Sequence, residues 1–127
     1  MIVVSNTSPI INLAAIGRFH LLETLLGRVF IPNAVYHEIA VVGAGEPGSD
    51  EVRENPNIIV KEVGQPIMVQ LLMHDLDPGE AEAIALAIEM KADLLLIDER
   101  RGRRRALELI MTFMKRFSGQ REKFEEW

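Results

Sequence analysis

Residues 77–98 constrain the fold of this 127-residue chain more than any other stretch, because they specify a helix followed by a strand. Asp77 is a favourable N-cap, Pro78 suits the first helical position, and Glu80 stands three residues after the cap. The rest of the helix is almost entirely Ala, Ile, Leu and Met, which predicts that it is largely buried. The apolar run at 94–97 suits a strand that is covered on both faces, as in a parallel sheet.

Three glutamates of this helix are expected to point in two directions. Glu82 and Glu89 are seven residues apart and share one face, which we interpret as the solvent-exposed face. Glu80 lies on the opposite side, toward the interior. Two roles for Glu80 remain open: it closes a capping box with Asp77, or it holds a metal ion together with Asp98, which follows the buried strand.

Composition limits the chemistry that the chain can perform. The chain is long enough for one domain with a real core, and it contains no cysteine and three scattered histidines. Any metal site must therefore use oxygen or imidazole ligands, which favours Mg²⁺ or Mn²⁺ over structural zinc. No apolar run is long enough for a signal peptide or a membrane span, so we expect a soluble, cytoplasmic protein with no membrane partner. The net charge of −5 argues against nonspecific coating of nucleic acid.

Strand-like and helix-like segments alternate along the rest of the chain. This alternation predicts an α/β fold in which helices cover both faces of a parallel sheet. We expect a helix that starts with Ser8 as its cap, and a Gly- and Pro-containing mobile loop or lid at 42–57 with one short helical turn. The other predicted strands are residues 2–4, 28–31 and 58–63, and the other predicted helices are 19–26, 32–39 and 66–74.

Oxygen-bearing side chains occur where ligands bind in open parallel sheets, beyond the carboxyl ends of the strands. Asn6 follows the first strand and Asp98 follows the last, while Glu38 borders the buried face of its helix. If Glu38 and Glu80 face the same crevice, the site holds three carboxylates and one amide. Carboxylates in one pocket repel one another unless a divalent cation neutralises them, and such an ion can activate water against a phosphodiester.

A run of arginines follows Asp98 and opens a predicted helix. Cations at a helix N-terminus oppose the helix dipole, so local stability does not explain the run and phosphate binding would. The alternative is a solvated surface that pairs with Glu99 and Glu108. The arginines of this run are Arg100, Arg101, Arg103, Arg104 and Arg105.

Three segments together resemble a PIN domain, specifically the PIN-like proteins related to the toxin ribonucleases of VapBC toxin–antitoxin modules. They are Val-Val-Ser-Asn-Thr-Ser-Pro at 3–9, Ile-Pro-Asn-Ala-Val-Tyr-His-Glu-Ile at 31–39, and the stretch at 79–104 that begins Gly-Glu-Ala-Glu-Ala and contains Leu-Leu-Leu-Ile-Asp-Glu-Arg-Arg-Gly-Arg-Arg. The resemblance implies a three-layer α/β/α sandwich with about four parallel strands over residues 1–109, leaving 110–127 as an atypical helical tail.

The resemblance also implies a function and a set of site residues. It implies RNA cleavage that depends on Mg²⁺ or Mn²⁺, an antitoxin as partner, and a homodimer. The implied metal ligands are Asn6, Glu38, Glu80 and Asp98, of which the three carboxylates are catalytic. We expect substrate to be bound by Thr7, Ser8, Arg100, Arg101 and Arg103.

The chain departs from the family pattern at two places. The acid that commonly follows the first strand is Asn6 here, and the usual fifth strand with a Gly-Thr pair is missing from residues 110–127. Two hypotheses follow. The protein is either a metal-dependent ribonuclease of toxin type, or a catalytically weak or inactive PIN fold that serves as an RNA-binding or protein-interaction module.

Overall fold

The computed structural model describes residues 1–97. Several expectations lie outside this part of the chain: the roles of Asp98 and of Arg100, Arg101 and Arg103, the helix that they were predicted to open, and the tail at 110–127. No helix among residues 1–97 is long and apolar enough to cross a membrane.

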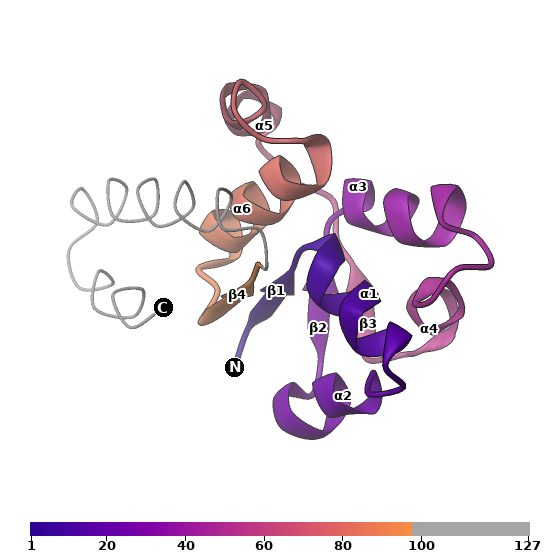
Figure 1. The fold of residues 1–127 in the computed structure, drawn as a ribbon. Helices are drawn as coiled ribbons and strands as arrows, with labels where there is room; N and C mark the ends of the chain where they lie inside the picture. The colour runs from indigo at the N-terminus through magenta and orange to yellow at the C-terminus, as the bar shows by residue number, and fades with distance from the viewer. Residues whose placement is uncertain (98–127) are drawn as a thin grey trace.

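Strands and helices alternate along the chain, as predicted (Figure 1). The strands are β1 (Val3–Ser5), β2 (Val29–Ile31), β3 (Ile58–Val60) and β4 (Leu94–Leu96). The helices are α1 (Thr7–Ala15), α2 (His20–Leu26), α3 (Asn33–Tyr36), the π-helix η1 (His37–Val42), α4 (Ser49–Glu54), α5 (Pro66–Leu72) and α6 (Pro78–Met90).

The four strands form one parallel sheet in the order β3-β2-β1-β4. The strand predicted near the end of residues 77–98 is β4, and it pairs with β1. In this register Val4 is paired with Leu95, and Ser5 with Leu96. β1 and β4 therefore end side by side although they are far apart in the sequence.

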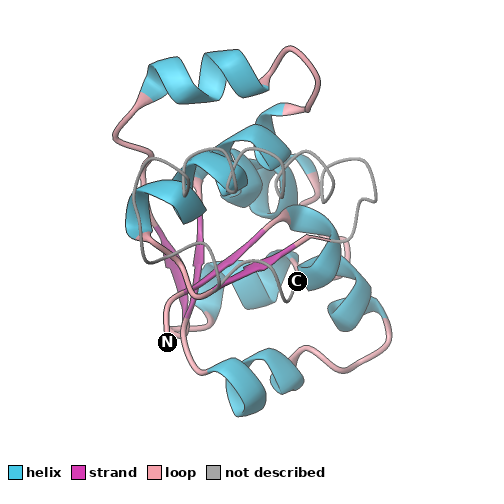
Figure 2. Cartoon of the chain, turned by 90° about the vertical axis from the view of Figure 1, so that its left-hand side faces the viewer, coloured by secondary structure: helices cyan, strands magenta, loops and turns pink. Residues whose placement is uncertain are grey.

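Alternating side chains of the strands enter two separate cores, one on each face of the sheet. Val4 and Leu95 pack with α5 and α6, whereas Val3, Val29 and Ile31 pack with helices from α1 to α4. Figure 2 shows the strands lying between these two groups of helices. Complete burial of one such aliphatic side chain contributes about 1.5–3 kcal/mol. The predicted α/β/α sandwich with a four-stranded parallel sheet is therefore confirmed.

The local signals that predicted the start of α6 are present in the structure. Asp77 Oδ1 accepts a hydrogen bond from the Glu80 N–H at 2.8 Å, and Pro78 occupies the first turn. The helix ends at Lys91, whose φ of 53° is left-handed and stops the helical repeat. The Ala- and Ile-rich middle is buried, so this helix supplies much of one core.

The helix predicted at 32–39 is instead a short α-helix that continues as a π-helix to Val42. The Gly43 N–H donates to the Glu38 carbonyl at 3.0 Å, a bond to the residue five positions earlier. A Cβ atom on Gly43 would lie 2.9 Å from the Ile39 carbonyl oxygen, so a residue without a side chain is needed there. The π-helical turn matters for the site because Glu38 lies within it.

Two further details differ from the prediction. The segment at 42–57 contains the predicted short helix, but α4 does not belong to a free loop, because it packs Ser49 and Val52 into the molecule, at 1% and 3% exposure. The strand and helix at the N-terminus are displaced by one or two residues: β1 ends at Ser5, and Asn6 rather than Ser8 occupies the N-cap position of α1. Differences of one or two residues are common at the ends of helices and strands, and Asn is as favourable an N-cap as Ser.

Candidate functional site

Asn6 lies at the carboxyl edge of the sheet, where the sequence placed it. Its backbone N–H donates to the Leu96 carbonyl at 2.9 Å, which joins the ends of β1 and β4. Asn6 is only 3% exposed, and its side chain makes no capping hydrogen bond to the backbone of α1. Burial of a polar side chain without a capping role suits a residue that is held for a local purpose other than starting the helix.

The residue after Asn6 fixes the orientation of Glu38. The Thr7 hydroxyl donates a hydrogen bond to Glu38 Oε2 at 2.8 Å. Thr7 is 6% exposed, whereas Glu38 is exposed, so a buried hydroxyl holds a carboxylate that faces solvent. A hydrogen bond to a charged carboxylate is stronger than one between neutral groups. Thr7 therefore positions an acid, and Ser8 follows it half-buried in the first turn of α1.

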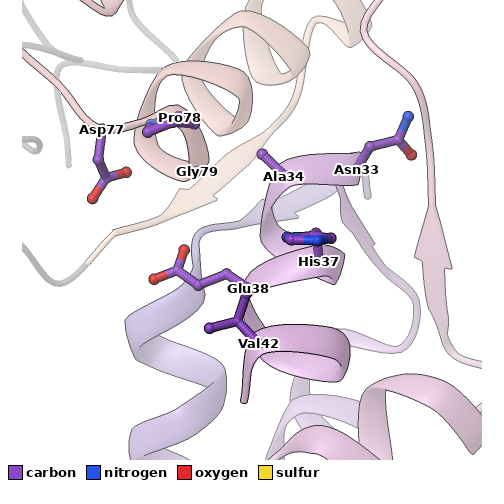
Figure 3. Close-up of a pocket in the computed structure, with 8 residues that line it drawn as sticks. All are labelled: Asn33, Ala34, His37, Glu38, Val42, Asp77, Pro78 and Gly79. Atoms are coloured by element: carbon purple, nitrogen blue, oxygen red, sulfur yellow. The ribbon is translucent and has the colours of Figure 1, made fainter. Parts of the chain in front are cut away.

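Gly79 provides the space in which the Glu38 carboxylate lies. A Cβ atom on Gly79 would lie 2.9 Å from Glu38 Oε2, 3.5 Å from Asp77 Oδ1 and 3.5 Å from Thr7 Oγ1. Three oxygens from three segments of the chain thus surround one point at the start of α6. Figure 3 shows the Glu38 and Asp77 side chains extending into the space between η1 and the first turn of α6.

Glu80 follows Gly79 in the first turn of α6. The N-cap half of the predicted capping box is confirmed by the bond from the Glu80 N–H to Asp77, and the Glu80 side chain is half-buried. Asp77 is the acid that sequence reasoning missed as a member of the site, because it was assigned a capping role alone. Its place in the sequence, at a helix N-terminus beside Glu80, was the available signal.

The predicted solvent-exposed position of Glu82 is wrong. Glu82 is half-buried, and its Oε1 accepts a hydrogen bond from the Ala34 N–H at 3.0 Å, in the first turn of α3. A carboxylate suits unpaired backbone N–H groups at a helix start. This bond ties α3, which leads to Glu38, to α6, which carries Glu80. Glu89, by contrast, is exposed as predicted.

The oxygens gathered here suit a hard divalent cation. Glu38, Asp77 and Thr7 offer only oxygen atoms around the space beside Gly79, which is the donor chemistry that Mg²⁺ and Mn²⁺ prefer. Within residues 1–97, however, no three acidic or histidine side chains converge closely enough to hold a metal ion. The described residues thus fit one part of an oxygen-ligated site, and a complete site needs a further ligand.

Fold and site together define a class of protein: a parallel α/β sandwich with acidic and amide side chains at the carboxyl edge of its sheet. A family model described as a PIN domain matches residues 2–114. The chain therefore belongs to the PIN-domain family, whose members have a nuclease-like fold, generally depend on divalent metal and often bind RNA. No curated protein and no solved structure matches the chain.

Replacing Gly79 with alanine tests the space beside Glu38. The added methyl group is too close to Glu38 Oε2, so this flexible carboxylate must move and weaken its bond to Thr7. Alanine is a better helix former than glycine by about 1 kcal/mol, so the free energy of unfolding is expected to hold or rise. Binding of Mn²⁺, measured by the rise in melting temperature, is expected to weaken about 10- to 100-fold if Glu38 is a ligand, because a displaced group that supports or ligates a metal costs that much affinity.

Gly64→Ala is the matched control for this substitution. A Cβ atom on Gly64 would encroach on the carboxylate of Glu89, which lies near the opposite end of α6. The control protein is expected to bind Mn²⁺ with the native affinity in the same measurement. Equal affinities of the native protein and Gly79→Ala would show that the space beside Glu38 is not needed for metal binding.

Proposed function

We propose that this protein is a metal-dependent endoribonuclease of toxin–antitoxin type. The observation that carries the proposal is the Glu38 carboxylate, which is held by Thr7 beside the first turn of α6 in a PIN fold. A flexible acid fixed by a buried hydroxyl is prepared for one geometry before any ligand arrives. Such preparation is typical of a site that binds an ion or a reacting group.

The metal ligands in this proposal are Asn6, Glu38, Glu80 and Asp98, with Mg²⁺ or Mn²⁺ as the ion. When bound, such an ion would polarise the phosphodiester and lower the pKa of a water molecule. Thr7 keeps Glu38 in its orientation, and Asp77 fixes the first turn of α6 through the Glu80 N–H. The bond that is cleaved is an RNA phosphodiester. Ser8, Arg100, Arg101 and Arg103 bind the RNA backbone.

The toxin–antitoxin assignment brings further proposals with it. We propose an antitoxin protein as the partner, a homodimer as the assembly and the cytoplasm as the place of action, where RNA is available. The assignment rests on the segments around Asn6, Glu38 and Asp98, which resemble those of VapBC toxins. Purification of the native chain with a protein from the same operon would support it.

An assay with single-stranded RNA tests the nuclease proposal. The full-length protein is incubated with labelled RNA in Mn²⁺ and, separately, in EDTA. Cleavage is expected in Mn²⁺ only, and it is expected to disappear in Asp98→Ala purified in parallel, which controls for contaminating ribonuclease. Absence of cleavage, together with no effect of Mn²⁺ on the melting temperature, would reject the proposal.

One observation favours a second function. Asn6 is an amide at the position where an acid is common, so the site has one negative charge fewer to hold a cation. A PIN fold with little or no catalysis would then bind RNA or protein. It would show salt-sensitive RNA binding without cleavage. The same RNA assay separates the two functions.

A further inference from the structure

A groove of about 490 Å³ runs along one side of α3 and η1 and is closed by the first turn of α6 (Figure 3). Its apolar surface comes from Ala34, Val42 and Pro78. Glu38 and Asp77 lie in the same groove, so it is continuous with the candidate metal site. The volume lies in the range of sites that take small organic groups.

The lining of the groove disfavours a phosphate group and favours a flat, neutral one. Among the described residues that line it, none is Lys or Arg, and two are carboxylates, so an anion would be repelled. His37 is exposed and, like Val42, lines the groove from η1. An exposed imidazole beside aliphatic side chains offers a surface for stacking of an aromatic ring, and the carboxylates can accept hydrogen bonds from its amino groups.

We propose that this groove binds an unpaired nucleobase of the RNA substrate, stacked on His37. The inference rests on the proposed function and deepens it, since it concerns which part of the strand lies next to the site. Glu38 belongs to both places. A base bound in the groove therefore lies beside the carboxylate that the proposed function assigns to the metal ion. The substrate class is single-stranded RNA, because a base held in a duplex does not present its faces.

Binding in EDTA tests this proposal without requiring cleavage, so its failure is distinct from failure of the nuclease proposal. Fluorescence anisotropy is measured with a labelled ten-nucleotide single-stranded RNA and with an abasic ribose-phosphate strand of equal length. The native protein is expected to bind the base-containing strand about 5- to 20-fold more tightly, as stacking on an aromatic side chain provides. His37→Ala is expected to remove this preference, and His37→Phe to keep it.

Two further readouts separate stacking from other roles of His37. A contact to a base leaves the dependence of affinity on salt unchanged, whereas loss of one phosphate contact lowers that slope by about one unit. His20→Ala, at another exposed helical histidine, is the control and is expected to keep the native preference. The proposal is overturned if the native protein does not distinguish the strands, or if His37→Ala weakens binding to both equally, as a groove for a protein segment or a structural role would predict.

Discussion

Glu38→Gln is expected to abolish metal-dependent RNA cleavage and to leave the fold intact. Glu38 is exposed, so its replacement disturbs no core, and glutamine retains a carbonyl oxygen that can accept the Thr7 hydrogen bond. The substitution removes a charge and preserves shape. Loss of a residue that only supports a metal ligand costs 10- to 100-fold, so loss of a direct ligand is expected to reduce kcat by at least about 100-fold.

Three measurements check this result. The initial rate of cleavage in Mn²⁺ gives kcat, circular dichroism gives the free energy of unfolding, and the melting temperature with and without Mn²⁺ reports metal binding. The free energy of unfolding is expected to change by less than about 0.5 kcal/mol, as for most surface substitutions. Glu89→Gln, at an exposed carboxylate that accepts from the Gly64 N–H, is the control. Native rates in Glu38→Gln would remove Glu38 from the catalytic residues.

The fold could be predicted where local signals and burial agree. At α6 the cap, the proline and the apolar run all indicate one helix, and the structure has it from Pro78 to Met90. The π-helix η1 could not be predicted, because a single π turn leaves no periodic pattern of apolar residues in the sequence. It also depends on the close approach of Gly43 to the Ile39 carbonyl oxygen. The segment at 42–57 was predicted as a mobile loop with one short helical turn, because its composition is polar and its apolar contribution to the core is one residue, Val52.

The candidate site was predictable to the extent that chain position determines it. Asn6 follows a strand, and this places it at the carboxyl edge of the sheet whatever surrounds it. The helical period places Glu80 and Glu82 on different faces of α6, but it could not show that α3 lies against the Glu82 face. Similarly, nothing in the sequence indicates that Thr7 meets Glu38, because the two residues are 31 positions apart and only the packed fold joins them.

Asn6→Asp is expected to strengthen metal binding, because it restores a negative charge at the carboxyl edge of the sheet with almost no change in shape.

The effect of Asn6→Asp on stability depends on whether the ion is bound. Asn6 is 3% exposed, so without metal the new carboxylate is buried without a compensating charge, which costs more than the roughly 1–3 kcal/mol of an unpaired neutral polar group. A negative charge at the N-cap of α1 offsets about 0.5–1 kcal/mol of this cost, which leaves a net loss. The melting temperature in EDTA is therefore expected to fall, and its rise on adding Mn²⁺ is expected to exceed that of the native protein. Cleavage is expected to increase about tenfold, the lower end of the 10- to 100-fold range over which groups that support a metal ligand change activity. Asn12→Asp, at an exposed position of the same helix, is the control for added charge. If Mn²⁺ raises the melting temperature of Asn6→Asp no more than that of the native protein, Asn6 does not face the ion.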